Sequence, residues 1–392
     1  MVDVSERAES MPWSGIRKMF NLADQNPDAI NLSVGQPGFD TPWHIVEAAR
    51  RALEEGQTQY TPGLGIPALR EAISRKVRRE NGLEADPDTE IMVTAGAMEG
   101  VTLSLLAAND PGDEVIIGDP CYTNYPGQIE LAGGRPVTVP VLEESGFRME
   151  PADIEQAITQ HTRLMMVNSP SNPTGRVLER DDLQALAEIA QRHDIFVLSD
   201  EPYERLVYDG TEHTSLAGLP GMKERTMTVF TVSKTYAMTG FRLGYVVGPA
   251  KVIDVMHKMQ EDIVSCIPAF VQQAGVAALD GPQDCVDTMV QEYDERRRLV
   301  VKALNQMDGI SCLEPRGAFY AFPNVSALGR TSEEVALYLL ERSRVVCVPG
   351  TAFGSGGEGH LRLSYSSSLE HLEEALKRIA RGAQELLNAR KR

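Results

Sequence analysis

The sequence has few of the features that mark disulfide-rich, membrane or secreted proteins. Its 392 residues include five cysteines, an odd number with no CxxC pair, which argues against a disulfide framework or a zinc ribbon. No apolar run approaches the ~20 residues of a membrane span. The first ten residues carry Asp3, Glu6 and Glu9 instead of the apolar core of a signal peptide. We therefore expect a cytoplasmic protein in a reducing compartment, with no metal site.

Basic residues are scarce as well. Lysine and arginine number 38 against 56 aspartates and glutamates, a formal net charge of −18. Such a charge opposes binding to nucleic acid or to an anionic membrane, so we expect neither as a partner. The hydrophobic content of 42% is that of an ordinary globular protein, and the length suits two or three domains.

Short apolar segments alternate with amphipathic ones through the middle of the chain. We expect strands at 91–94, 115–118, 163–168, 195–199, 227–232 and 242–248, and a helix at 181–193. Strands this apolar are buried on both faces, which predicts an α/β fold with a mostly parallel sheet covered by helices. A long charged helix is expected over about 286–307. We expect an N-terminal arm (1–45) that packs with a small C-terminal domain (285–392), and a large domain between them (46–284).

Polar and aromatic residues follow these strands, where ligands bind in open α/β sheets. They are Gly96-Ala97-Met98 after the first, Tyr122 after the second, Ser171-Asn172-Pro173-Thr174-Gly175 after the third, Asp200 and Tyr203 after the fourth, and Ser233-Lys234 with Arg242 after the fifth. Each alone is more often structural: a helix cap, a turn or a solvated lysine. Together, at successive strand ends, they indicate a site for a flat, phosphorylated, aromatic cofactor that carries a carbonyl group.

These segments resemble the class I aminotransferases, which are pyridoxal-phosphate enzymes of fold type I. The resemblance also includes Gly35-Gln36-Pro37, Tyr60-Thr61-Pro62, Gly240-Phe241-Arg242-Leu243-Gly244 and Arg362-Leu363-Ser364, and spans about residues 31–368 in family order. With Ile16-Arg17-Lys18, the chain is most similar to the aspartate and aromatic aminotransferases of bacteria and archaea. The resemblance implies a large cofactor-binding domain, a smaller α/β domain and a homodimer with shared active sites. It also implies transfer of an amino group from an L-amino acid, with aspartate favoured over an aromatic amino acid, to 2-oxoglutarate by a ping-pong mechanism.

The resemblance further implies a role for each matching residue. Lys234 forms a Schiff base with pyridoxal 5′-phosphate and moves the substrate proton, while Asp200 pairs with the ring nitrogen. Tyr203 and Asn172 bind the phenolic oxygen of the cofactor, and Tyr122 stacks on the face of its ring. The α-carboxylate of the substrate is bound by Arg362, together with Asn172 and Gly35. The phosphate contacts are Gly96, Ala97, Met98, Thr231, Ser233, Arg242 and the partner subunit's Tyr60. Two positions depart from the family pattern: Thr231, where Gly or Ser is usual, and Gly38, where Asp is common.

Other interpretations are less well supported. The segment 63–68 (GLGIPA) approximates a dinucleotide fingerprint, but it follows an expected helix at about 44–55 where that motif requires a strand. The segment 354–359 (GSGGEG) lacks the Lys-Ser/Thr of a phosphate loop. A transcription regulator would need a DNA-binding module and a basic patch. A C–S β-lyase, or another pyridoxal-phosphate enzyme on the same fold, stays open because a fold does not fix the reaction.

Overall fold

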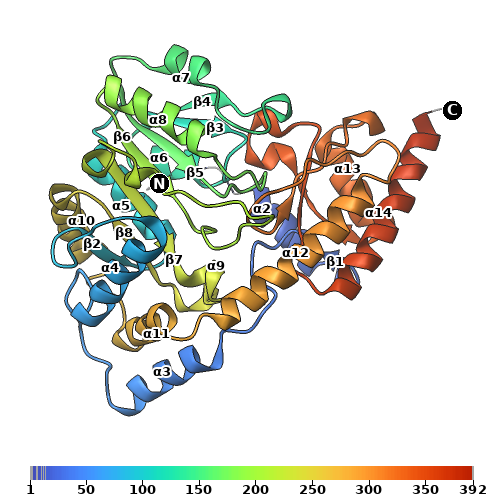
Figure 1. Ribbon diagram of the computed structural model, residues 1–392. Coiled ribbons are helices and arrows are strands. Elements are labelled where there is room, and N and C mark those ends of the chain that lie inside the picture. The colour runs from blue at the N-terminus through green and yellow to red at the C-terminus, as the bar shows by residue number, and fades with distance from the viewer. Residues whose placement is uncertain (1–2, 6–7, 10, 12, 14, 391–392) are drawn as a thin grey trace.

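The computed structural model describes residues 3–5, 8–9, 11, 13 and 15–390. Figure 1 shows a large lobe built around an open sheet and a smaller lobe that contains the C-terminal helix. The long helix α12 (Asp284–Leu304) runs from the large lobe into the small one. The N-terminal and C-terminal parts of the chain therefore meet in the small lobe, because α2 (Gly15–Asp24) also lies there.

The sheet of the large lobe has seven strands in the order β2-β8-β7-β6-β5-β3-β4. Their bounds are β2 (Ile91–Thr94), β3 (Glu114–Asp119), β4 (Arg135–Pro140), β5 (Thr162–Asn168), β6 (Phe196–Asp200), β7 (Thr226–Thr231) and β8 (Gly244–Val247). Only β8 runs against its neighbours, β2 and β7. The expected mostly parallel sheet is confirmed, and each expected strand lies within two residues of its predicted bounds.

The edge strand β4 is the one strand of this sheet that the sequence did not predict. Its segment contains Pro136 and Pro140, and proline within a strand usually argues against the assignment because it lacks an amide hydrogen. The backbone N–H groups of Arg135 and Val141 donate to carbonyls of the β3 side. Backbone N–H groups point alternately to the two sides of a strand. Those of Arg135 and Val141 point toward β3, so positions 136 and 140 point away from it, and the missing amide hydrogens of the two prolines break no hydrogen bond between β4 and β3.

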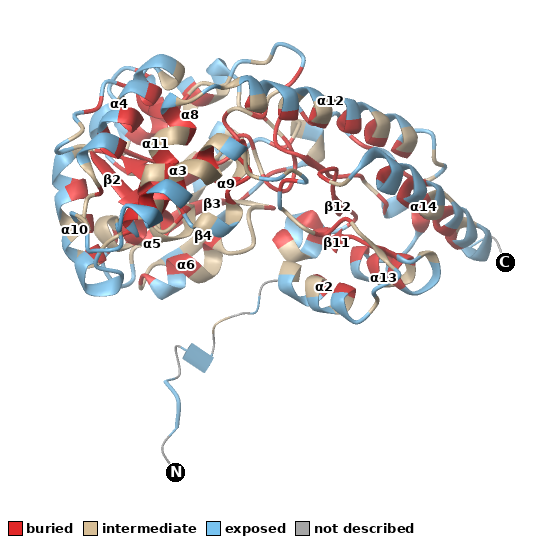
Figure 2. Cartoon of the chain, turned by 90° about the horizontal axis from the view of Figure 1, so that it is seen from below, coloured by how far each residue is buried: buried red, intermediate tan, exposed pale blue. Residues whose placement is uncertain are grey.

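Helices cover both faces of the sheet and turn their buried residues toward it (Figure 2). One face is covered by α5 (Ala97–Ala108), α6 (Tyr125–Leu131) and α10 (Ala250–Ile263). The other is covered by α4 (Pro67–Asn81), α7 (Pro151–Ala157), α8 (Arg180–Arg192) and α11 (Ala269–Asp280), with α3 (Trp43–Glu54) packed on α11. The helices expected at 181–193, 44–55 and 286–307 correspond to α8, α3 and α12.

The small lobe is built on a short antiparallel sheet of β11 (Val348–Pro349), β12 (Leu361–Ser364) and β9 (Tyr320–Ala321). Around it lie α13 (Ser332–Tyr338), which continues into a π-helical turn η6 (Leu339–Ser343), and α14 (Leu369–Arg390). From the N-terminal segment, β1 (Ile30–Asn31) pairs with β10 (Val345–Val346), and α2 packs on β11 and the 3₁₀ turn η7 (Gly350–Phe353).

Residues 1–2, 6–7, 10, 12 and 14 of the expected arm, and 391–392 of the expected small domain, lie outside the described residues. The other short elements are η1 (Glu143–Ser145), η2 (Leu216–Gly218), η3 (Lys223–Arg225), α9 (Val232–Thr235), η4 (Thr239–Phe241), η5 (Ser326–Leu328) and η8 (Ser355–Gly357).

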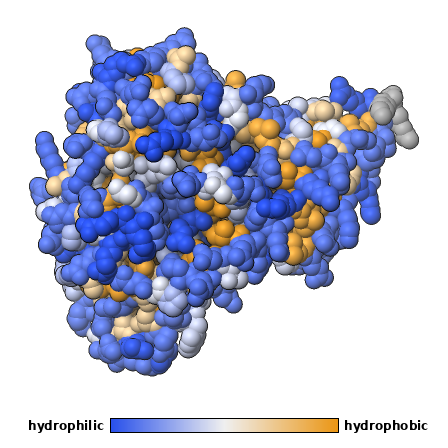
Figure 3. All heavy atoms as spheres, viewed as in Figure 1, coloured by the Kyte–Doolittle hydropathy of each residue, from blue (hydrophilic) through white to orange (hydrophobic). Residues whose placement is uncertain are grey.

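The visible face of the molecule is mostly hydrophilic. Figure 3 shows apolar side chains gathered near the middle of this face and over the small lobe. Among the described residues, no helix is both long and apolar enough to cross a bilayer. All five cysteines are free thiols.

Candidate active site

A cavity of about 300 Å³ lies at the carboxyl ends of the parallel strands, where the two lobes meet. Asp200 ends β6, Lys234 lies on α9 directly after β7, and Arg362 comes from β12 of the small lobe. The predicted site residues that line the cavity are Gly35, Ala97, Met98, Tyr122, Asn172, Asp200, Tyr203, Thr231, Ser233, Lys234, Arg242 and Arg362. The fold therefore brings together side chains that are scattered over more than 300 residues of sequence.

Lys234 lies in an environment that increases the fraction of its amine that is neutral. Its Nζ donates a hydrogen bond to the backbone oxygen of Gly35 at 2.7 Å. Burial, with the positive charges of Arg362 and Arg242, lowers the pKa of Lys234 to about 8. About a tenth of the amine is then neutral at pH 7, and a neutral amine is the form that attacks a carbonyl carbon.

Asp200 presents a buried carboxylate with one oxygen still free. Its Oδ2 accepts a hydrogen bond of 2.6 Å from the hydroxyl of Tyr125, while Oδ1 is buried without a partner among the described residues. Burial raises the pKa of Asp200 to about 6, although the Tyr125 hydrogen bond acts in the opposite direction. The group is therefore mostly ionised at pH 7, and its free oxygen suits a cationic N–H donor.

The first turn of α5 is suited to an anion. Gly96 precedes the helix with φ of +77°, and a Cβ at this position would lie 2.5 Å from the guanidinium of Arg242. The first backbone N–H groups of a helix have no partner within it and attract anions, which here applies to Ala97 and Met98. Ser233 also lines the cavity.

The hydroxyl of Thr231 has a structural role beside this site. It accepts from the backbone N–H of Ser233 at 3.1 Å, which caps α9, and lies 2.9 Å from the backbone oxygen of Leu243. The threonine that departs from the family pattern therefore fixes the start of the short helix that carries Lys234.

Arg362 is the second group in the cavity that is suited to an anion. The side chain is 1% exposed, and its guanidinium lies 4.6 Å from the ring centre of Tyr320 and 5.0 Å from that of Phe353. It donates to Oδ1 of Asn172 at 3.1 Å and to the backbone oxygen of Ser33, while its Nε is buried without a partner. No carboxylate within the described part of the chain pairs with Arg362. A buried cation without a counter-ion, with a free N–H, is suited to a carboxylate ligand.

Besides Tyr125, three tyrosines line the cavity: Tyr122, Tyr203 and Tyr320. The hydroxyl oxygens of Tyr203 and Tyr320 lie 2.8 Å apart. Burial raises the pKa of Tyr122 to about 12 and the pKa of Tyr203 well above its ordinary value, so both phenols stay protonated at neutral pH. They can therefore donate hydrogen bonds to an oxygen of a bound molecule.

Two predicted residues do not line the cavity. Gly96 lies just outside it, beside Arg242, and Tyr60 is 91% exposed at a separate depression that includes His257 and Cys266. Sequence reasoning also missed Tyr125 as the partner of Asp200. Its only signal was its place three residues after Tyr122, which does not distinguish a site residue from a core one.

Comparisons with known proteins point to one family. A family model described as aminotransferase class I and II matches residues 27–379. An aspartate aminotransferase of Pyrococcus abyssi is 45% identical over 96% of this chain and 97% of its own length. An aromatic-amino-acid aminotransferase of Thermococcus litoralis is 43% identical over 96% of this chain and 97% of its own. The crystal structure of an aspartate aminotransferase from Thermus thermophilus with maleate is 40% identical, covers 97% of this chain and 100% of its own, and superposes with a TM-score of 0.92.

Proposed function

The chain belongs to the class I and II aminotransferases, and from this premise we propose that it moves an amino group from an L-amino acid to 2-oxoglutarate with pyridoxal 5′-phosphate as cofactor. The observation that carries the proposal is the convergence on one cavity of a lysine with a lowered pKa, a carboxylate with a free buried oxygen and an arginine without a counter-ion. Each is a group that amino transfer with this cofactor requires.

The residues present fit pyridoxal 5′-phosphate. The unpartnered Oδ1 of Asp200 would hold the protonated ring nitrogen, and the phenol of Tyr203 would donate to the ring oxygen. The first turn of α5, Ser233 and Arg242 would hold the phosphate. When bound, the cofactor supplies a covalent attachment point for amines and a cationic ring that withdraws the electron pair left at the substrate Cα.

Lys234 performs the proton transfer in the proposed cycle. Its neutral Nζ would take the proton from the substrate Cα and then, as general acid, deliver it to the cofactor carbon that is bonded to the amino nitrogen. The pKa of about 8 suits both directions, because neither the neutral amine nor the ammonium is rare near neutral pH. The hydrogen bond to Gly35 places Nζ at the inner wall of the cavity.

Arg362 binds and orients the substrate. Its Nε has no acceptor in the described part of the chain, so a substrate α-carboxylate can accept from the guanidinium without displacing the bonds to Asn172 and Ser33. The aromatic rings of Tyr320 and Phe353 fix the plane of the guanidinium and exclude water from it. The carboxylate therefore meets a rigid donor, and the Cα–H bond is held in one orientation.

We favour aspartate as the amino donor, with aromatic amino acids as the second class. Relatives with both names are more than 40% identical to this chain, and the solved structure of the Thermus enzyme is one with maleate, a dicarboxylate. Ile16, Tyr122 and Tyr320 give the cavity an apolar wall that an aromatic side chain could contact.

The test is a half-reaction with single amino acids. The purified chain is loaded with pyridoxal 5′-phosphate and mixed with one amino acid without any oxo acid, and the visible absorbance of the cofactor is followed. Fast loss of the band with aspartate and glutamate, and slow loss with phenylalanine and tyrosine, is the expected result. The reverse order would identify an aromatic enzyme. Release of ammonia and pyruvate from cysteine conjugates, without any loss of the band with these donors, would instead identify a β-lyase.

Tyr60 is proposed to complete the phosphate site of a second subunit in a homodimer. The support is its full exposure and its absence from the cavity of its own chain. Mixing Tyr60→Ala with Arg242→Ala subunits tests this arrangement. If Tyr60 reaches the partner, one site of each mixed dimer has both wild-type residues, and activity is regained at limiting cofactor. No regain in a mixture shown to contain mixed dimers would contradict the proposal.

A further inference from the structure

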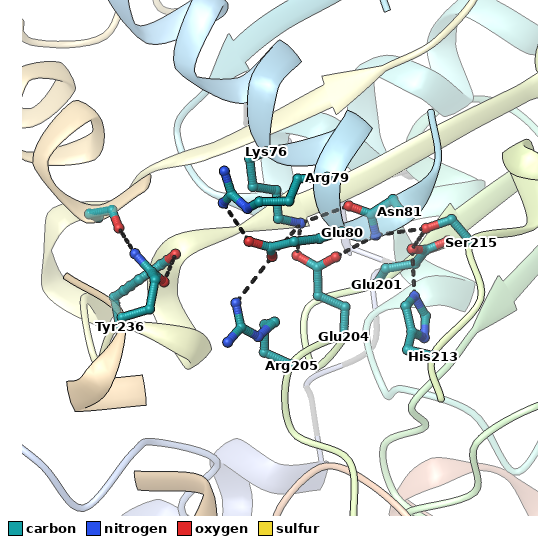
Figure 4. A network of polar contacts seen from close by, with 12 residues as sticks. Lys76, Arg79, Glu80, Asn81, Glu201, Glu204, Arg205, His213, Ser215 and Tyr236 are labelled. Atoms are coloured by element: carbon teal, nitrogen blue, oxygen red, sulfur yellow. Dashed lines mark hydrogen bonds and ion pairs between the residues drawn. The ribbon is translucent and has the colours of Figure 1, made fainter. Parts of the chain in front are cut away.

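A buried polar network lies directly behind the segment that carries Asp200 and Tyr203. Figure 4 shows it between α4 and the loops that follow β6. Asp200 and Tyr203 line the cavity, whereas Glu201 and Glu204 belong to this network. Glu201 is 1% exposed, so an acidic group without catalytic contacts is buried next to the residue that would hold the cofactor ring.

Both oxygens of Glu201 have hydrogen-bond donors. Oε2 lies 2.8 Å from Nε2 of His213 and accepts from Ser215 at 2.6 Å, and Oε1 accepts from Ser199 at 2.7 Å. Burial lowers the pKa of His213, but the charge and the hydrogen bond of Glu201 outweigh this effect and raise it. Glu201 therefore favours the protonated form of His213, and in that form the two side chains are a buried ion pair in which removing either charge leaves the other uncompensated.

The surrounding charges are matched in the same way. Lys76 contacts Glu204 and lies 2.9 Å from Oδ1 of Asn81, and Glu80 lies 3.3 Å from the guanidinium of Arg205 (Figure 4).

The same cluster has a spacing that could also bind a cation. Glu201, Glu204 and His213 offer ligand atoms within 4.8 Å of one another. Lys76 and His213 already compensate the two carboxylates, however, which favours an ion-pair network over a metal site.

We propose that the Glu201–His213 pair acts through Asp200 as a positioning unit. The charge balance of the pair sets the proton affinity of the groups that surround the bound cofactor. This inference rests on the proposed function. Glu201 is adjacent to Asp200 in the chain, and its negative charge already raises the pKa of Asp200, so an unbalanced charge on it changes the field at the carboxylate that faces the ring. An added negative charge favours the protonated form of every nearby group, and an added positive charge does the opposite.

The experiment is a pH titration of the visible absorbance of the loaded full-length chain. We expect His213→Gln to raise the midpoint of the spectral change by ~0.5 pH unit or more, about a threefold rise in proton affinity. Glu201→Gln should lower it by a similar amount. The double variant should return close to the wild-type midpoint, because it removes the pair as a unit.

A matched control pair exists at the surface. His193 lies 2.7 Å from Glu155, between α8 and α7, and both side chains are about one third exposed. His193→Gln therefore removes the same kind of contact far from the cavity, and its midpoint should equal that of the wild type.

The outcomes separate this inference from the function on which it rests. A normal band with unshifted midpoints in His213→Gln and Glu201→Gln, even with lower thermal stability, would show a merely structural pair and overturn the inference alone. If Glu201→Gln does not fold, an unshifted midpoint in His213→Gln still overturns it. A wild-type chain that shows no band after loading would overturn the proposed cofactor, and the inference with it.

Discussion

The hydrogen bond from Tyr125 to Asp200 makes a quantitative prediction for Tyr125→Phe. The contact is 2.6 Å long and buried, and the other carboxylate oxygen already lacks a partner. A hydrogen bond to a charged group is worth ~1.5–3 kcal/mol, so its loss should raise the pKa of Asp200 by ~1–2 units from its value of about 6.

The magnitude follows from the fraction of Asp200 that is ionised. At pH 6 this fraction falls from about half in the wild type to roughly 1–10% in Tyr125→Phe. If the ionised carboxylate holds the cofactor ring, cofactor affinity at pH 6 should fall ~5–50-fold. At pH 9 both proteins are almost fully ionised at this position, and their affinities should agree within about 20%.

The assay is a fluorescence titration of the apoprotein with pyridoxal 5′-phosphate at both pH values. Tyr365→Phe is the control, because Tyr365 is equally buried and its hydroxyl donates to the backbone of Ala318. An equal loss of affinity at pH 6 and pH 9, or no loss at pH 6, would refute the reasoning.

Three further substitutions test the remaining parts of the site. Arg362→Lys should retain the cofactor but raise the KM of every amino acid by ~10–100-fold, since lysine cannot form two parallel bonds to a carboxylate; substrate-dependent losses in steady-state kinetics would contradict this. Asp200→Asn should stabilise the apoprotein at pH 7 by on the order of 2–3 kcal/mol in urea unfolding, because the folded-state pKa of Asp200 is raised from 3.8 to about 6. The loss of folding free energy from the ionised carboxylate is complete above that pKa and vanishes below about pH 4. Equal gains in stability at pH 4 and pH 7 would therefore show that the ionised carboxylate is not the cause. Gly96→Ala should weaken cofactor binding ~10-fold or more, because its Cβ would lie 2.5 Å from Arg242 at φ of +77°; an unchanged dissociation constant would show that the phosphate does not use this turn.

The sheet could be predicted from the sequence because its strands are short, apolar and followed by polar residues. β2 matches its predicted bounds, and the residues after β5, β6 and β7 do line the cavity. Local pattern was sufficient there, since the carboxyl ends of parallel strands meet at one edge. The place of Arg362 in the site came only from the family resemblance, because no pattern in its own segment indicates a binding role.

What the sequence could not predict are contacts between distant segments. The backbone oxygen of Ser33 that accepts from Arg362 lies 329 residues away in the chain. The partner of Asp200 is a tyrosine 75 residues earlier, on the first residue of α6. His213 and Glu201 are close in sequence, but only the folded loop shows that they form a pair. Such contacts depend on tertiary packing, which residue spacing does not encode.

The two prolines of β4 also have a consequence for solubility. An exposed sheet edge is a template on which other chains can add strands and start aggregation. Of the outward-facing positions 136, 138 and 140, only Thr138 has an amide hydrogen to offer a foreign strand. Pro136 and Pro140 thus protect the large lobe against intermolecular strand addition, and replacing both by threonine would expose that edge during folding and storage.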